Sequence, residues 1–337
     1  MHVHACQYVC SDASPREWPA THVECGRAGE EGTHRKMPVM FCRRALVDGL
    51  IKRALGKDLA TIEQEIDQTL APQSHLLAGW SATVGAEVKV NFAEVKNVIG
   101  VLEGEGPLAD ETVVVGAHYD HLGMGGAGSL APWTRATHNG ADDNGSGTAA
   151  MLEIAHRLAT AGKKPRRRVV FIAFTAEERG LLGSRHYVRE PLFPLEKTVA
   201  MVNLDMVGRL KDDKLIVYGT GSAVEFDSML EELNKKYAFQ LTKHATGFGP
   251  SDQASFFEKK IPVFHFFTGL HEEYHRPSDD FELINLPGMC RVTAMASEIV
   301  SQIIAADAPP TYQDTNATRN AALGEGSRPL FGAVPED

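Results

Sequence analysis

The apolar residues of this chain fall into short continuous runs separated by stretches with helical periodicity, and this pattern restricts the possible folds. Residues 112–117, 169–174 and 262–267 are such runs, and each has the length of a strand rather than of a helix. A strand that is apolar along its whole length belongs in a sheet that is covered on both faces. Residues 148–161 instead repeat apolar residues at helical spacing. This alternation predicts an α/β fold with a mainly parallel, mixed central sheet and helices on both faces.

The same patterns predict the remaining elements of this domain. We expect further strands over residues 83–92, 96–103, 199–205 and 215–219. We expect further helices over residues 181–188, 224–238 and 286–305.

Composition divides the chain into a leader, a small segment, a main domain and a tail, at residues 1–36, 37–77, 78–306 and 307–337. The leader lacks periodicity and is expected to be unstructured. The small segment has an apolar strand pattern at 37–41 and helical patterns at 45–55 and 59–70, and it is too short to bury its own core. The tail is rich in Pro, Gly, Asn and Thr and is expected to be extended or to act as a linker.

The charge balance excludes some classes of partner. The formal net charge is -10, which argues against nucleic acid because phosphate neutralisation needs clustered Lys and Arg. The basic run at residues 163–168 lies between a predicted helix and a predicted strand, and we interpret it as a solvated loop. No stretch has the roughly 18 apolar residues needed to cross a bilayer. The sequence therefore predicts neither a nucleic-acid partner nor a membrane span.

Imidazoles and carboxylates follow the expected buried strands, at the ends where parallel sheets bind their ligands. Two imidazoles and three or more carboxylates in such positions make a ligand set for two zinc ions. The candidate metal ligands are His118, Asp143, Glu178, Asp205 and His275.

Each motif also has an ordinary structural explanation when it is taken alone. His118 and Asp120 form a short H-x-D pattern that is often structural. Asp143 begins a Gly-rich turn before a helix, where acidic residues favour the helix dipole, and Glu177 with Glu178 fits the acidic first turn of another helix. Asp205 is harder to explain, since a carboxylate ending a buried strand needs a partner or a cation. The combination favours a metal site over these separate explanations.

Other histidines of the main domain are interpreted as packing or surface residues, namely His121, His138, His156, His186, His244, His265 and His271. The segment 122–139 is a long loop that contains Trp133, and we expect it to line the substrate entrance.

These motifs resemble those of the di-zinc aminopeptidase family of metallopeptidases, which includes bacterial secreted aminopeptidases, glutamate carboxypeptidases and the related glutaminyl cyclases. The resemblance covers roughly residues 88–305 and implies a zinc-exopeptidase-like fold with a peptide substrate. It implies two zinc ions as cofactors. In this resemblance His118 and Asp205 hold one ion, Glu178 and His275 hold the other, and Asp143 bridges them.

The resemblance also implies roles for residues that do not bind metal. Glu177 matches the general acid/base, and Asp120 matches the residue that orients the first histidine. Tyr274 matches a tyrosine that polarises the scissile carbonyl in some members of the family. A cis peptide bond is expected between Asp143 and Asn144.

Segments outside the main domain carry their own resemblances. Residues 37–77 are similar to the end of a protease-associated domain, and the terminal sequence GSRPLFGAVPED is similar to the start of a further module, such as a PDZ-type domain. These similarities imply a longer, extracytoplasmic enzyme, although the first 36 residues lack the apolar core of a secretory signal.

The function expected from all of these features is a zinc-dependent exopeptidase that hydrolyses a terminal peptide bond, and an aminopeptidase in particular. A carboxypeptidase with the same chemistry is compatible with the motifs. Two further alternatives are a glutaminyl cyclase-like acyltransferase with a single zinc ion and a non-catalytic, receptor-like interaction domain. The sequence does not favour any oligomeric state.

Overall fold

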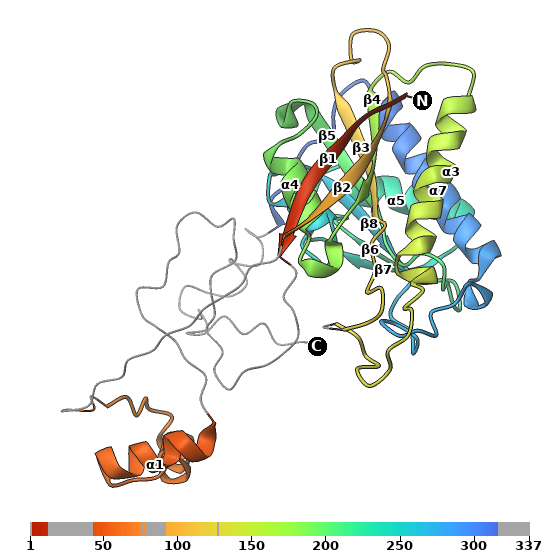
Figure 1. The fold of residues 1–337 in the computed structure, drawn as a ribbon. Coiled ribbons are helices and arrows are strands. Elements are labelled where there is room, and N and C mark those ends of the chain that lie inside the picture. The colour runs from red at the N-terminus through yellow and green to blue at the C-terminus, as the bar shows by residue number, and fades with distance from the viewer. Residues whose placement is uncertain (1, 13–42, 76, 78–91, 127, 316–337) are drawn as a thin grey trace. The chain divides into compact units, whose positions relative to one another are not determined.

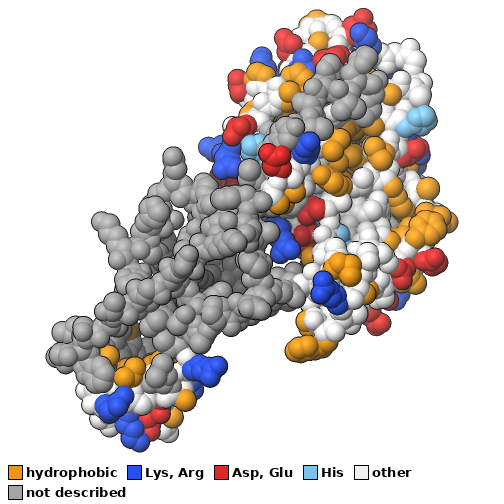
Figure 2. All heavy atoms as spheres, in the orientation of Figure 1, with side chains coloured by type: hydrophobic (Ala, Val, Ile, Leu, Met, Phe, Trp, Pro, Cys, Tyr) orange, Lys and Arg blue, Asp and Glu red, His pale blue; other side chains and the backbone are white. Residues whose placement is uncertain are grey.

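The computed structural model describes residues 2–12, 43–75, 77, 92–126 and 128–315. The chain divides into two compact units, one formed by residues 1–11 with 94–337 and the other by residues 12–93. Among the described residues, no helix combines the length and the apolar character that crossing a bilayer requires. On the face shown in Figure 2, the acidic and basic side chains of the described residues are interspersed.

The larger unit is built on one mixed sheet of eight strands in the order β1-β2-β4-β3-β5-β8-β6-β7. The bounds of its strands are His2–Asp12, Phe92–Leu102, Thr112–His118, Arg168–Phe174, Thr198–Leu204, Lys214–Tyr218, Gln240–His244 and Val263–Phe267 for β1 to β8. Strands β4, β3, β5 and β8 run parallel to one another, and β6 runs parallel to β7. Strand β2 is antiparallel to β4, and β6 is antiparallel to β8.

Helices cover both faces of the sheet, as the apolar runs predicted (Figure 1). The helices of this unit are Gly147–Thr160, Leu182–Arg189, Phe226–Tyr237, Gln253–Phe257 and Leu286–Ala305 for α3 to α7. Strand β3 is buried along its whole length because its residues alternate between two cores: Val113 and Val115 pack with residues of α3, α5 and α7, whereas Val114 packs with residues of α4 and α6. The mainly parallel, mixed sheet with helices on both faces is therefore confirmed.

The carboxyl ends of β3, β4 and β5 lie next to one another because these strands are parallel neighbours. Residues that follow the carboxyl ends of parallel strands no longer take part in strand pairing, so their side chains can bind ligands there. This edge of the sheet carries the candidate metal ligands.

The smaller unit contains two described helices, α1 (Arg44–Leu55) and α2 (Leu59–Thr69), where helices were predicted at 45–55 and 59–70. Asp58 caps α2, and its side chain accepts a hydrogen bond from the Thr61 amide. Arg44 donates hydrogen bonds from Nη1 and Nη2 to the Glu63 carboxylate, at 2.5 and 2.6 Å, and this contact joins the two helices. The strand predicted at 37–41 and most of the strand predicted at 83–92 lie outside the described residues.

Three elements differ from the expectations. Residues 2–12 form strand β1 at the edge of the sheet, where an unstructured leader was expected. Strand β7 and the short helix α6 were not predicted. Strand β7, with the sequence QLTKH, lies at the edge of the sheet and is largely exposed to solvent. Its sequence therefore lacks a clear alternation of apolar and polar residues. A prediction that depends on apolar patterns therefore did not identify these edge strands.

The start of the predicted tail also has a fixed place. The Val224 amide donates to the Thr311 carbonyl, and the Gln313 amide donates to the Ser222 carbonyl. Tyr312 packs against the core that contains α6. Residues 307–315 thus follow the surface of the main domain, whereas residues 316–337 lie outside the described part.

The interpretation of the basic run at 163–168 as a solvated loop is wrong for Arg167, which is fully buried. Its guanidinium donates to Glu111 at 2.6 Å and to three main-chain carbonyls at the end of α7. Burial of this charge is tolerated because a carboxylate neutralises it and the helix end supplies acceptors.

Candidate metal centre

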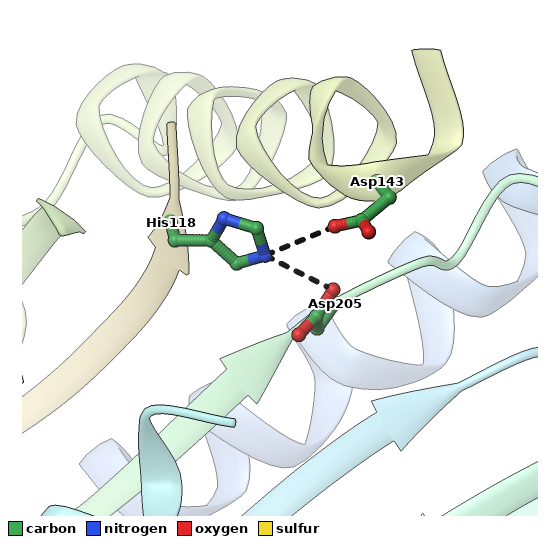
Figure 3. A group of neighbouring side chains, drawn as sticks. All are labelled: His118, Asp143 and Asp205. Carbon is green, nitrogen blue, oxygen red and sulfur yellow. Dashed lines mark ion pairs between the residues drawn. The ribbon is translucent and has the colours of Figure 1, made fainter. Parts of the chain in front are cut away.

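Three of the predicted ligands meet at the carboxyl edge of the sheet, as Figure 3 shows. His118 ends strand β3, Asp143 precedes helix α3, and Asp205 follows strand β5. The His118 Nε2 atom lies 3.3 Å from Asp143 Oδ1 and 3.4 Å from Asp205 Oδ1. These three side chains therefore form one group whose donor atoms face a common point.

The other two predicted ligands form a second group around the same Asp143. The His275 Nε2 atom lies 3.2 Å from Asp143 Oδ2 and 3.3 Å from Glu178 Oε2. Asp143 thus presents Oδ1 to His118 and Oδ2 to His275. A carboxylate whose two oxygens face two separate donor groups has the arrangement of a bridge between two cations.

Both histidines are held in the tautomer that a metal needs. The Nδ1 atom of His118 lies 3.0 Å from the carbonyl oxygen of Asp120, and Nδ1 of His275 lies 2.8 Å from the carbonyl oxygen of Gly128. A carbonyl oxygen can only accept, so each Nδ1 carries the proton and donates it. In the neutral ring the lone pair is then on Nε2, the atom that faces the carboxylates and would bind a metal.

Asp143 is positioned by its neighbours in the sequence Asp142-Asp143-Asn144-Gly145-Ser146-Gly147. The peptide bond between Asp143 and Asn144 is cis, as expected. The Asn144 side chain donates to the Leu204 carbonyl and accepts from the Gly147 amide. Gly147 is needed because a Cβ there would lie 2.2 Å from both Asn144 Oδ1 and the Leu204 carbonyl oxygen. The glycine lets the start of α3 approach the end of β5 and brings Asp143 close to Asp205.

Asp279 supports the same turn from a distant part of the chain. Its Oδ2 atom accepts hydrogen bonds from the amides of Asp142 and Asp143, at 2.9 and 3.1 Å. Asp279 lies four residues after His275, so one loop supplies both a ligand of the second group and the anchor of the bridging aspartate.

Asp120 lies beside His118, and its main-chain carbonyl makes a closer contact with the ring than its carboxylate does. Its carboxylate lies 3.8 Å from His118 Nδ1, whereas its own main-chain carbonyl is the acceptor for that ring nitrogen. The Asp120 carboxylate instead accepts from the amides of Glu177 and Glu178, at 3.0 and 3.4 Å. Asp120 therefore orients His118 through its backbone and fixes the acidic turn after β4 through its side chain.

Electrostatics at the centre fit bound cations. Burial raises the pKa of Glu177 well above its usual range, and the attraction of His118 only partly opposes this shift. Burial would also raise the pKa of Asp143, but contacts with His118 and His275 outweigh it and lower that pKa. For His118, burial disfavours the charged ring, yet Asp205 and Asp143 outweigh burial and raise its pKa. In the metal-free protein, bound protons compensate the excess negative charge of these side chains. Divalent cations would displace these protons.

A further observation fits a cation near Asp205. Its Oδ1 atom is buried and lies 3.4 Å from His118 Nε2, but no contact among the described residues satisfies it as a hydrogen bond. An unsatisfied buried carboxylate oxygen is costly unless a cation compensates for it. The donor set, with imidazole nitrogens and carboxylate oxygens, is the one that zinc prefers.

A small cavity of about 70 Å³ opens beside the two groups. Glu177 lines it together with four of the candidate ligands, His118, Asp143, Asp205 and His275. Tyr274 also lines it, and its ring stacks on that of His275 with the ring centroids 3.7 Å apart. Burial raises the pKa of the Tyr274 phenol, and the charge of Asp143 adds to this effect. The phenol therefore keeps its proton and remains a hydrogen-bond donor. The rest of the lining is largely apolar, with Met206, Tyr218, Phe267 and Leu270.

The loop 122–139, expected at the substrate entrance, is connected to the second group. Gly128 accepts from His275 Nδ1, and the Leu130 amide donates to the His275 carbonyl. Trp133 of the same loop is 96% exposed. Its place at a substrate entrance stays a prediction.

One residue of the centre was assigned wrongly from the sequence. His121 was interpreted as a packing or surface histidine, but its Nδ1 atom lies 2.7 Å from Glu178 Oε1 and 3.8 Å from Asp143 Oδ2. The spacing of the H-x-D motif gave no reason to include the next residue. The signal that could have drawn attention to it is a second imidazole directly after the H-x-D motif, in His118-Tyr119-Asp120-His121.

Comparison with known proteins agrees with this geometry. The profile described as peptidase family M28 matches residues 97–300. The aminopeptidase YwaD of Bacillus subtilis is 32% identical over 200 residues, which cover 56% of this chain and 40% of YwaD. The probable glutamate carboxypeptidase LAMP1 of Arabidopsis thaliana is 33% identical over 236 residues, which cover 61% of this chain and 31% of LAMP1. This chain thus spans less than half the length of either curated relative.

A solved structure shows the same fold. The crystal structure of BSAP, a zinc aminopeptidase from Bacillus subtilis, aligns with a TM-score of 0.53 and 28% sequence identity. The alignment covers 67% of this chain and 55% of the BSAP chain.

Proposed function

Because this chain belongs to peptidase family M28, we propose that it is a zinc-dependent exopeptidase that releases amino-terminal residues from peptides. The observation that carries this proposal is the position of Asp143, whose two oxygens face the two separate groups of donors. A single carboxylate shared in this way suits a pair of cations rather than one. We assign His118 and Asp205 to one zinc ion, Glu178 and His275 to the other, and Asp143 to both.

Two bound zinc ions would polarise the scissile carbonyl and lower the pKa of the attacking water. Glu177 lines the cavity beside the ligands, and its amide is fixed by Asp120 at 3.0 Å. In our proposal its carboxylate takes the proton of the water as the new C–O bond forms. Glu177 then passes this proton to the nitrogen atom that leaves as the C–N bond breaks. The products are a free amino acid and a peptide that is one residue shorter.

Tyr274 has the proton that an oxyanion donor needs. Its phenol lies at the cavity, and the surrounding burial and carboxylates keep it neutral. We propose that it donates a hydrogen bond to the carbonyl oxygen as negative charge develops there.

The cavity favours recognition of a free amino terminus. Among the described residues that line it, none is Lys or Arg, whereas Asp143, Glu177 and Asp205 contribute carboxylates. Glu177 is not assigned to zinc and could attract a protonated α-amino group, whereas the described lining offers a terminal carboxylate no Lys or Arg to pair with. The relatives YwaD and BSAP are named aminopeptidases, which supports the same choice over a carboxypeptidase.

Paired substrates test this proposal. Aminoacyl-anilides with a free amino group should be cleaved, the same compounds with a blocked amino group should not, and a chelator should abolish cleavage. Zinc analysis of the active protein should give two ions per chain. Cleavage of blocked substrates alone would exclude an aminopeptidase. One zinc ion together with cyclisation of glutaminyl peptides would point to the acyltransferase alternative.

A further inference from the structure

A third imidazole, that of His121, lies in the wall of the metal centre beside Glu178. We propose that His121 is a positioning residue that donates a hydrogen bond to Glu178 and turns the other oxygen of this carboxylate toward the metal. This inference rests on the proposed function, since it concerns the ligand of the second zinc ion.

The two oxygens of Glu178 have different neighbours. Oε1 lies 2.7 Å from Nδ1 of His121, and Oε2 lies 3.3 Å from Nε2 of His275. An ionised carboxylate can only accept hydrogen bonds, so Nδ1 of His121 carries the proton of this contact. With Oε1 engaged by a donor, Oε2 is the atom that remains for the metal.

The position of the His121 ring is fixed by its surroundings. Its side chain is 9% exposed, and the ring meets that of His275 edge-on at 5.7 Å. Gly140 makes room for it, because a Cβ there would lie 2.7 Å from the Cγ atom of His121. The Nε2 atom is buried and has no hydrogen-bond partner in the described part of the chain. The contact with Glu178 is therefore the polar interaction that this ring provides.

His121 also forms a candidate metal-binding group with Asp143 and Glu178, but its short contact with Glu178 favours a hydrogen bond over coordination. Its Nδ1 atom is 3.8 Å from Asp143 Oδ2, whereas Nε2 of His275 is 3.2 Å from the same oxygen. The proton that Nδ1 donates to Glu178 also occupies the position through which this nitrogen would bind a cation. His275 has its proton on the opposite nitrogen and is free to coordinate.

Groups that orient a metal ligand typically contribute about 10–100-fold to metal affinity. Removal of the His121 donor should therefore weaken the site formed by Glu178 and His275. The site formed by His118 and Asp205 does not depend on Glu178 and should keep its affinity. A selective loss at one of two sites is the signature of this role.

Two substitutions of similar size separate the hydrogen bond from packing. In His121→Asn the amide nitrogen takes the place of Nδ1 and can still donate to Glu178, whereas His121→Leu has no donor. His121→Gln places its amide nitrogen near the position of Nε2, one atom too far along the side chain. His156→Leu, on an exposed face of α3, is the control for loss of a histidine.

The measurement is zinc titration of the full chain against a competing chelator, with circular dichroism of each metal-free variant to compare folding. We expect His121→Leu and His121→Gln to lose about 10–100-fold in affinity at one site, His121→Asn to recover most of this loss, and His156→Leu to match wild type. Unchanged affinities in His121→Leu would overturn the role of His121. Equal losses in the Asn and Leu variants would also overturn it. A wild-type chain that binds fewer than two zinc ions would instead overturn the proposed function.

Discussion

Replacement of Arg167 should destabilise the fold more than any change in the exposed part of the same basic run. The Arg167 side chain is fully buried and makes four hydrogen bonds, one to Glu111 and three to the carbonyls of Ile303, Ile304 and Ala306. These carbonyls end helix α7 and have no further helical amides to accept from. Arg167 thus neutralises a carboxylate and caps a helix at the same time.

The expected cost follows from these contacts. Breaking a buried ion pair by removal of one partner costs about 3–5 kcal/mol, because the remaining groups lose their compensation. Glu111 is partly exposed, with 24% of its side-chain surface accessible, so water can solvate it in part. We therefore expect Arg167→Met to lower the free energy of unfolding by about 3 kcal/mol, at the lower end of that range. Arg167→Lys keeps the charge but not the planar set of donors, and about half of this loss should remain.

Urea unfolding followed by circular dichroism measures these losses, and an unchanged dependence on urea concentration would show that the same transition is being compared. Arg166→Met is the control, because Arg166 is about half exposed, pairs with the exposed Asp307 and donates to one carbonyl, that of Ala305, at the end of α7. Its cost should stay below about 1 kcal/mol. An Arg167→Met variant as stable as Arg166→Met would refute the reasoning. A double-mutant cycle with Glu111→Gln would isolate the energy of the ion pair itself.

Four further predictions concern the metal centre and its surroundings. Glu177→Gln should keep both zinc ions but lower kcat on the order of a hundredfold or more; normal turnover would remove Glu177 from the mechanism. Tyr274→Phe should lower kcat with little change in zinc content, and equal rates would exclude an oxyanion role. Saturating zinc should raise the melting temperature, since a ligand at about 100 times its Kd adds about 2.7 kcal/mol; no shift would mean that zinc does not bind the folded chain. Burial raises the pKa of Asp252 to about 7, so the folded metal-free protein holds a proton that the unfolded chain releases near pH 4. Its free energy of unfolding should fall, by at most about 4 kcal/mol, as pH rises from about 4 to about 7; this dependence should be reduced in Asp252→Asn and retained in the exposed control Asp110→Asn.

The sequence was sufficient to predict the central strands because burial on both faces of the sheet restricts which residues they can contain. Strands β3 and β5 are almost completely buried, so most of their side chains are apolar. The proximity of the candidate ligands at their ends could also be predicted, because the direction of parallel strands brings His118 and Asp205 to one edge. Strand β7 could not be predicted, since it is half solvated and its place depends on pairing with β6.

The contacts of polar residues whose partners are distant in the sequence could not be predicted from residue spacing. His121 contacts Glu178 across 57 positions, and Arg167 contacts the end of α7 across 136 or more positions. Neither residue lies in a periodic pattern that reveals whether it faces the core. Each was therefore interpreted as the commonest case for its residue type, a surface or packing residue. Both interpretations missed the polar partner for the same physical reason. Partners that are distant in sequence decide whether a buried polar group is tolerated.

The two residues also lie at opposite edges of the sheet, which makes their effects separable. Arg167 directly precedes the first residue of β4, and Glu177 and Glu178 follow its last one. Helix α7 has 20 residues and is about 30 Å long. Arg167 contacts its carboxyl end, whereas its amino end follows the loop that carries His275 and Asp279. A loosened carboxyl end therefore leaves the contacts of Asp279 with the Asp143 turn intact. We expect Arg167→Met to unfold at lower urea but to bind zinc with wild-type affinity below its transition. His121→Leu should show the reverse, with near-normal stability when metal-free and one weakened zinc site.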